Sequence, residues 1–290
     1  MDKIDVKGIL IPIGGNEDKG IVNGRGDAYR MDFVCEGILS HVVKQSGGLN
    51  AKIVVIPAAS SIPKEIAQNY LDAFKKLGCT DVHILQILER SDSENPEAIE
   101  LIKTANGVLF TGGDQSKIVK KIFDSTIHHI MMERFINEPF VIAGTSAGAM
   151  CMSQEMITGG NDIDSFRKGT VAMGSGMGFI PELIIDSHFI RRGRFGRLTE
   201  AVAKFPHLVG VGLAEDTGLI IQSKKEFQVI GSGMAIIIDA RHATHNYQRI
   251  LHEGTPMTVV DLRTHILSNG DRFEIKTRRI KVLPLRADFV

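Results

Sequence analysis

The 290-residue sequence lacks an excess of charge of either sign, because 34 lysine and arginine residues balance 34 aspartate and glutamate residues. This balance excludes overall steering towards nucleic acid or an anionic membrane, so any recognition of charge has to be local. The chain also lacks an apolar run of about 18 residues, the length that spans a bilayer. Its first residues lack the basic and apolar regions of a signal peptide, so we expect a cytoplasmic protein.

Cysteine is scarce, and the three thiols Cys35, Cys79 and Cys151 have no metal-ligand spacing. Two of them lie in apolar surroundings, where a buried, reduced thiol is usual. We therefore expect no disulfide framework, no metal and no other cofactor.

Short apolar runs alternate with stretches that fit helices in the first half of the chain. Continuous apolarity indicates strands covered on both faces, as in a parallel sheet. The predicted strands are 8–13, 51–57, 82–87, 107–110 and 140–143, and the predicted helices are 31–43, 63–77, 96–104 and 116–135. This alternation predicts an α/β fold, a three-layer sandwich with a mostly parallel, doubly wound sheet.

Beyond residue 205 the pattern changes to strands separated by tight turns, at 208–213, 218–222, 226–230 and 235–239. We expect these strands to be antiparallel additions to the same sheet, so that residues 1–290 form a single domain. The glycine-rich stretch 174–178 is predicted to be a loop.

Ser146 lies where the apolar strand 139–143 leads directly into Gly-x-Ser-x-Gly. Such a strand-to-helix turn projects a serine hydroxyl above the sheet, and small neighbours allow close approach of a substrate. We interpret Ser146 as a nucleophile, and an ordinary turn of small residues is the alternative. Because ligands of open α/β sheets gather at the carboxyl ends of strands, its partners should lie in loops that follow strands.

Two such loops carry the chemistry of a catalytic triad. His188 follows an apolar run and could act as general base for Ser146. Glu215 and Asp216 lie at a turn between two predicted strands, where either could orient the imidazole or simply form a hairpin turn. The order serine, histidine, acid differs from that of the α/β-hydrolases and excludes that fold.

Paired glycines in loop 110–115 could present free backbone N–H groups as half of an oxyanion hole, with the Ala147 N–H as the other half. The alternative is a turn that opens a helix capped by Asp114. Loop 13–19 is also glycine-rich, but it lacks the dinucleotide and P-loop motifs.

Four arginines occur within the seven residues 191–197, with no carboxylate among them. A basic helix start is usually a solvated surface. Interrupted by glycine and phenylalanine, this cluster is more typical of a carboxylate-binding array, because the planar guanidinium binds carboxylates in a bidentate way.

Together these segments resemble the cyanophycinases, in the serine peptidase family that also includes the α-aspartyl dipeptidase peptidase E. The resemblance covers most of the chain and rests on 14–19, 56–60, 110–115, 144–149, 186–189 with the arginines that follow, and 212–217. It implies a fold like the class I glutamine amidotransferases, a homodimer, nucleophile Ser146, base His188 and acid Glu215. It also implies that Gly113 and Ala147 donate the oxyanion hydrogen bonds.

The family substrate is cyanophycin, a poly-aspartate with arginine on each β-carboxyl, which is cleaved to β-aspartyl-arginine dipeptides. The resemblance implies that the substrate groove is lined by Gln115, Asp186, Ser187, Arg192, Arg194 and Arg197. The arginines could bind carboxylates of the polymer, and Asp186 and Gln115 could accept from its guanidiniums. Ser187 stands where glutamine is expected, and its shorter side chain removes one hydrogen-bonding arm.

Two other functions stay open at this point. The first is an aspartyl dipeptidase of the peptidase E type, which would have less use for so many arginines. The second is a non-catalytic protein on the same scaffold that holds an anion at Gly14–Gly15 or at the arginines.

Overall fold

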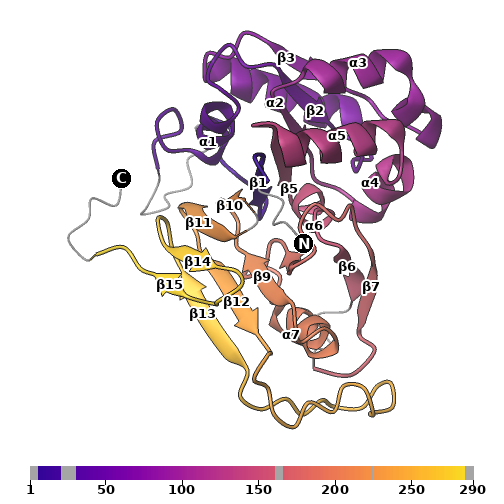
Figure 1. Ribbon diagram of the computed structural model, residues 1–290, viewed down its shortest axis with the longest axis vertical. Coiled ribbons are helices and arrows are strands. Elements are labelled where there is room, and N and C mark those ends of the chain that lie inside the picture. Colours follow the sequence, from indigo (N-terminus) through magenta and orange to yellow (C-terminus); the bar gives the residue numbers. More distant parts are fainter. Residues whose placement is uncertain (1–5, 21–30, 161–165, 224, 285–290) are drawn as a thin grey trace.

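The computed structural model describes residues 6–20, 31–160, 166–223 and 225–284, and its main sheet has nine strands in the order β15-β14-β11-β10-β1-β5-β4-β2-β3 (Figure 1). Five neighbouring strands are parallel: β1 (Ile9–Ile13), β5 (Val141–Thr145), β4 (Gly107–Phe110), β2 (Ile53–Ile56) and β3 (Val82–Ile84). Four antiparallel strands extend this core: β10 (Thr217–Gln222), β11 (Glu226–Gly231), β14 (Arg272–Glu274) and β15 (Ile280–Lys281). The predicted α/β class is confirmed.

Helices cover both faces of the parallel part, which gives three layers. One face packs against α1 (Ile38–Gln45) and α2 (Pro63–Lys76). The other packs against α3 (Pro96–Thr104), α4 (Gln115–Ile122) and α5 (Thr126–Asn137), and the 3₁₀ helix η1 (Arg90–Glu94) lies beside them. Because side chains alternate along a strand, Val55 contacts the first layer and Val54 the second.

A second sheet has the order β13-β12-β9-β8, with bounds β8 (Leu183–Asp186), β9 (Val209–Leu213), β12 (Ala235–Asp239) and β13 (Arg263–Leu267). The prediction that 208–213 and 235–239 join the main sheet was therefore wrong, whereas 218–222 and 226–230 do join it. Apolarity shows that a strand is buried but does not identify its neighbour. The chain crosses between the sheets at 214–216 and again at 232–234.

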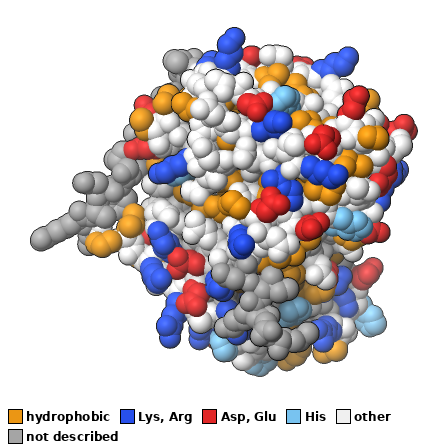
Figure 2. Space-filling model, turned by 45° about the horizontal axis from the view of Figure 1, so that its top comes forward, with side chains coloured by type: hydrophobic (Ala, Val, Ile, Leu, Met, Phe, Trp, Pro, Cys, Tyr) orange, Lys and Arg blue, Asp and Glu red, His pale blue; other side chains and the backbone are white. Residues whose placement is uncertain are grey.

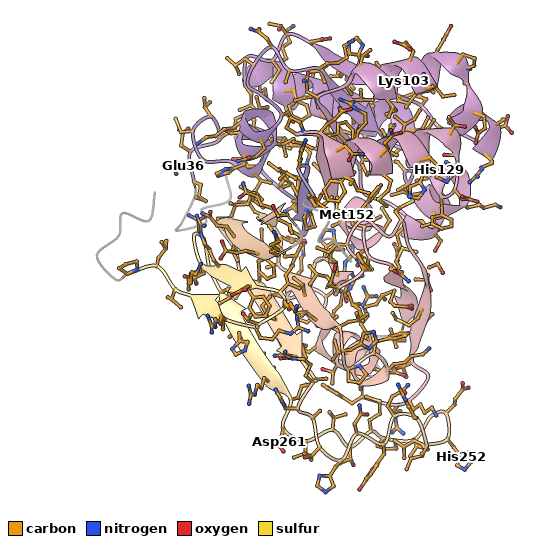
Figure 3. The ribbon with its side chains drawn as sticks, in the orientation of Figure 1. Glu36, Lys103, His129, Met152, His252 and Asp261 are labelled. Atoms are coloured by element: carbon orange, nitrogen blue, oxygen red, sulfur yellow. The ribbon has the colours of Figure 1, made fainter. Side chains whose placement is uncertain are left out.

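One apolar cluster joins the facing sides of both sheets, and Met152 of this cluster lies near the middle of the molecule (Figure 3). Helix α7 (Phe195–Lys204) covers the other side of the second sheet through Leu198 and Val202. Strands β6 (Glu155–Gly160) and β7 (Val171–Ser175) form a separate hairpin. The predicted loop 174–178 thus begins as the end of β7.

Two predicted helices have different bounds in the structure. The helix predicted at 31–43 begins only at Ile38, because the Asp32 carboxylate accepts from the Val34 and Cys35 N–H groups and forms a turn instead. The helix predicted at 116–135 is two helices, since Asp124 has a φ of 58° and Ser125 caps α5 by accepting from His128 N.

Acidic and basic side chains are intermixed on the face shown in Figure 2, as the balanced composition leads one to expect. Within the described ranges, no helix is long and apolar enough to cross a membrane.

Candidate active site

Ser146 occupies a strained turn between β5 and α6 (Ala147–Met150), with φ 52° and ψ −109°. This conformation is rare for a residue other than glycine and costs about 1–3 kcal/mol, so the surroundings have to hold it in place. Ser146 N donates to Ile13 O at 2.8 Å. A side-chain carbon at Gly144 would lie 2.3 Å from Gly148 O. The glycines of the motif therefore allow the turn that presents the serine.

His188 follows β8 and is bound to a carboxylate. Its Nδ1 lies 2.9 Å from Oε1 of Glu215, which stands on the crossing between β9 and β10. The neighbouring Asp216 instead accepts from Asp18 N at 3.2 Å and from the Ser232 hydroxyl. Glu215, and not Asp216, is thus the carboxylate that contacts the imidazole, a choice that spacing alone left open.

Glu215 also accepts hydrogen bonds from a second side chain, which the sequence did not predict. Arg191 Nη1 lies 3.0 Å from its Oε2 and 3.2 Å from its Oε1, although sequence reasoning placed Arg191 only in the arginine cluster. Burial raises the pKa of Glu215, but hydrogen bonds from His188 and Arg191 and their charges lower it overall. The carboxylate is therefore ionised at neutral pH and can stabilise an imidazolium.

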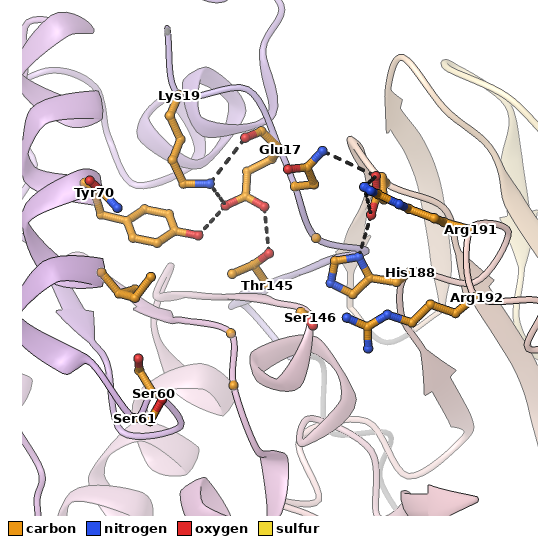
Figure 4. Close-up of a pocket in the computed structure, with 17 residues that line it drawn as sticks. Glu17, Lys19, Ser60, Ser61, Tyr70, Thr145, Ser146, His188, Arg191 and Arg192 are labelled. Atoms are coloured by element: carbon orange, nitrogen blue, oxygen red, sulfur yellow. Dashed lines mark hydrogen bonds and ion pairs between the residues drawn. The ribbon is translucent and has the colours of Figure 1, made fainter. Parts of the chain in front are cut away.

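Ser146 and His188 line one cavity of about 790 Å³, together with Glu17, Lys19, Tyr70, Arg191, Arg192, Glu215 and neighbouring loop residues (Figure 4). We call it the triad lobe. The Ser146 hydroxyl lies 3.4 Å from that of Ser187, which also donates to Met150 Sδ. Ser187 is therefore next to the nucleophile itself.

A second cavity of about 360 Å³, the arginine lobe, meets the first at Gly113, Ser146 and Arg192. It is lined further by Gln115, Ser187, Arg194, Arg197 and neighbouring residues. Ser146 thus lies at the junction of two lobes.

Two backbone donors flank this junction. In the described part of the chain, neither Gly113 N nor Ala147 N donates a hydrogen bond. Gly113 is held tightly, since a side-chain carbon there would lie 2.2 Å from Ala59 O. These N–H groups are available to an oxygen atom of a ligand.

The arginines of the cluster differ in their partners, because two of them bind a buried carboxylate. Asp186 is fully buried and accepts from Arg194 Nη1 at 3.1 Å and Arg197 Nε at 2.6 Å. It lines neither lobe, so its placement does not support the expectation that it accepts from a substrate guanidinium.

The Gln115 amide nitrogen donates to Ile157 O at 2.8 Å. Arg192 is exposed and makes no ion pair within the described residues.

Sequence reasoning missed the role of the loop that follows β1. Gly14 O accepts from His188 N at 2.8 Å, and Asn16 Nδ2 donates to Glu215 Oε2 at 3.3 Å. A side-chain carbon at Gly15 would lie 2.4 Å from His188 Cε1, so only glycine lets the imidazole lie there. The position of this loop at the carboxyl edge of the sheet was the available signal.

A serine on a strained turn, an imidazole held by a carboxylate and two spare N–H groups together match the arrangement that a serine hydrolase needs. The sequence profile of peptidase family S51 matches residues 26–229, and the chain belongs to this family. It is a serine peptidase, which confirms the predicted enzyme class and does not favour a non-catalytic binding protein.

The relatives agree with this assignment. The chain is 36% identical to the cyanophycinase of Trichormus variabilis over 94% of this chain and 88% of the relative. It is 33% identical to that of Geminocystis herdmanii, over 93% and 94%. A crystal structure of a peptidase from an acI-B1 actinobacterium has the same fold, with a TM-score of 0.62, 20% identity and coverage of 93% and 98%.

Proposed function

We propose that this serine peptidase hydrolyses cyanophycin, removing β-aspartyl-arginine dipeptides from the polymer end. Its cyanophycinase relatives support this substrate. The observation that carries the proposal is Arg192, an exposed guanidinium without an ion pair in the described residues, placed beside Ser146 where both lobes meet. A polymer with a free α-carboxylate on every branch is a natural ligand for such a group.

The proposed reaction begins when Ser146 Oγ attacks the α-peptide carbonyl between successive aspartyl units. His188 Nε2 takes the serine proton and passes it to the leaving amine, while Glu215 stabilises the imidazolium through Nδ1. Gly113 N and Ala147 N bind the oxyanion. Water, deprotonated by His188, then attacks the aspartyl ester and restores the Ser146 hydroxyl.

We assign the arginine lobe to the arginine-bearing branches. Arg192, Arg194 and Arg197 would bind carboxylates. Because the Gln115 amide nitrogen already donates to the β6 backbone, its oxygen is oriented to accept from a guanidinium. Ser187 is too short to reach across the lobe, so it would act beside Ser146.

We also propose that residues 1–290 form one domain and that the enzyme is a cytoplasmic homodimer. The family resemblance supports the dimer. Sedimentation equilibrium would test it, and a monomer at micromolar concentration would count against it.

Incubation of the enzyme with purified, insoluble cyanophycin, followed by mass spectrometry of the soluble products, tests the function. We expect β-aspartyl-arginine from the first time point for wild type and none for Ser146→Ala, whose thermal unfolding should match wild type. Asp-X dipeptides are the comparison substrates. Release from dipeptides alone would indicate peptidase E activity, and longer early products would indicate attack within the polymer.

A further inference from the structure

Glu17 is a buried carboxylate at the catalytic centre that takes no part in the proton transfers described above. It lies in the loop after β1 and is only 4% exposed. It accepts hydrogen bonds from Thr145 Oγ1 at 2.7 Å, from Lys19 Nζ at 3.0 Å and from the Tyr70 hydroxyl (Figure 4). A buried charge is costly unless it is paired and hydrogen-bonded. The complete set of partners around Glu17 therefore indicates a role for its charge.

The protonation state of Glu17 favours a role as hydrogen-bond acceptor over a role as acid or base. Burial raises its pKa, but the charge of Lys19 and the hydrogen bonds from Tyr70, Thr145 and Lys19 lower it to about 2. A carboxylate with so low a pKa stays ionised throughout the neutral range and is a weak base, which suits it to accepting hydrogen bonds.

The contacts of Glu17 connect both halves of the catalytic centre. Thr145 directly precedes Ser146 on β5. The loop that carries Glu17 contacts the other half, through Gly14 O to His188 N and through Asn16 to Glu215. Glu17 is thus the side chain that joins the loop of the base and acid to the strand of the nucleophile.

We propose that Glu17 is a positioning residue, whose carboxylate ties the segment Gly14–Lys19 to Thr145 and so fixes the Ser146 hydroxyl relative to the His188–Glu215 pair. This proposal rests on the triad of the proposed function. It distinguishes Glu17 from the arginines, which contact substrate, and assigns the Gly-Gly-Asn-Glu-Asp-Lys segment to the geometry of the triad instead of to ligand binding.

The effect should fall on turnover and not on affinity. In Glu17→Gln, one carboxylate oxygen becomes an NH₂ group, which cannot accept from the donors on that oxygen, either Tyr70 and Lys19 or Thr145, and the negative charge is lost. Since misplacement by about 1 Å can cost about 100-fold, we expect kcat to fall by about 10-fold to 100-fold. KM should change by less than about 3-fold, because the binding arginines are untouched.

Thr145→Val and Thr145→Ser form a matched pair, because only serine keeps the hydroxyl. We expect Thr145→Val to lower kcat as Glu17→Gln does, Thr145→Ser to restore most of it, and the double variant Glu17→Gln/Thr145→Val to lose little more than either alone. The low-field proton resonance of His188 Nδ1–H gives a readout without substrate. It should shift or broaden in Glu17→Gln and remain as in wild type in Thr145→Ser.

Unchanged kcat and an unshifted resonance in a folded Glu17→Gln would overturn the proposal. So would a Thr145→Ser variant as slow as Thr145→Val. If Glu17→Gln does not fold, the Thr145 pair decides by the same criteria. If the wild-type enzyme leaves cyanophycin intact, the proposed substrate is wrong, but the resonance still shows whether Glu17 positions the imidazole.

Discussion

The triad lobe and the arginine lobe both reach Ser146, but their charges are arranged differently. In the triad lobe each carboxylate lines the cavity and has a cation of its own, Glu215 with Arg191 and Glu17 with Lys19. In the arginine lobe the buried carboxylate of Asp186 lies behind Arg194 and Arg197, which line the cavity. Paired charge suits proton transfer, whereas an excess of guanidinium suits an anionic ligand. The triad lobe is therefore suited to the catalytic reaction, and the arginine lobe is suited to substrate binding.

The largest effect that this contrast predicts concerns the acid of the triad. Glu215→Gln should lower kcat by about 10⁴-fold, because an amide favours the wrong imidazole tautomer, and should leave KM nearly unchanged. Steady-state kinetics on cyanophycin measures both. Asp216→Asn is the matched control, since Asp216 bonds Asp18 and Ser232 instead of His188. Equal losses in the two variants would contradict the assignment.

In the arginine lobe the carboxylate should matter for stability instead. Asp186→Asn removes the buried carboxylate that accepts from Arg194 and Arg197, which should lower the free energy of unfolding by about 3–5 kcal/mol. Urea denaturation measures this loss. Asp114→Asn, on the exposed rim of the same lobe, keeps its helix cap and should change stability by less than about 0.5 kcal/mol. A stable Asp186→Asn variant with weakened substrate binding would show that Asp186 acts on binding and not on stability.

The triad lobe should in turn be the acid-sensitive one. Because the pKa of Glu17 is lowered from 4.5 to about 2, its contribution to stability is complete above pH 4.5 and is lost as the pH falls towards about 2. The contribution is on the order of 3 kcal/mol. Urea unfolding at pH 6, 4 and 3 should show a smaller decline for Glu17→Gln than for wild type. Parallel declines would exclude this source of acid sensitivity.

The smallest effect concerns the residue that both lobes share. Arg192→Gln should raise KM by about 10-fold to 100-fold, the value of one charge-assisted hydrogen bond, without changing the melting temperature. Arg191→Gln is the control, because Arg191 binds Glu215 and its loss should act on kcat. If Arg192→Gln lowered kcat and left KM unchanged, Arg192 would act in the catalytic step and not in substrate binding.

Much of this site could be predicted from the sequence because its elements are local. The turn at Ser146 follows from an apolar strand, a serine and its flanking glycines, and α3 was predicted with the bounds that it has. The break at Asp124 carried a signal in Ser125, a good helix cap. The partners of the second sheet carried none, since β9 and β12 are as apolar as the strands of the main sheet.

Long-range pairing explains the rest. Glu17 and Thr145 are 128 residues apart, and nothing in either segment indicates the other. The pairing of Asp186 with Arg194 and Arg197 spans only one turn and the start of α7, yet the sequence shows only that these charges are near each other. Whether a charge faces a cavity or another side chain depends on packing, which a pattern of residue types does not encode.

Glu215 stands on the three-residue crossing 214–216, the shortest route by which the chain passes from the second sheet to the main one. Ser146 belongs to the main sheet, and His188 follows a strand of the second. The acid is therefore part of one of the covalent connections between the two sheets that carry its partners. New chain ends or a lengthened linker at this crossing should displace Glu215 from His188, which makes it a poor place for circular permutation.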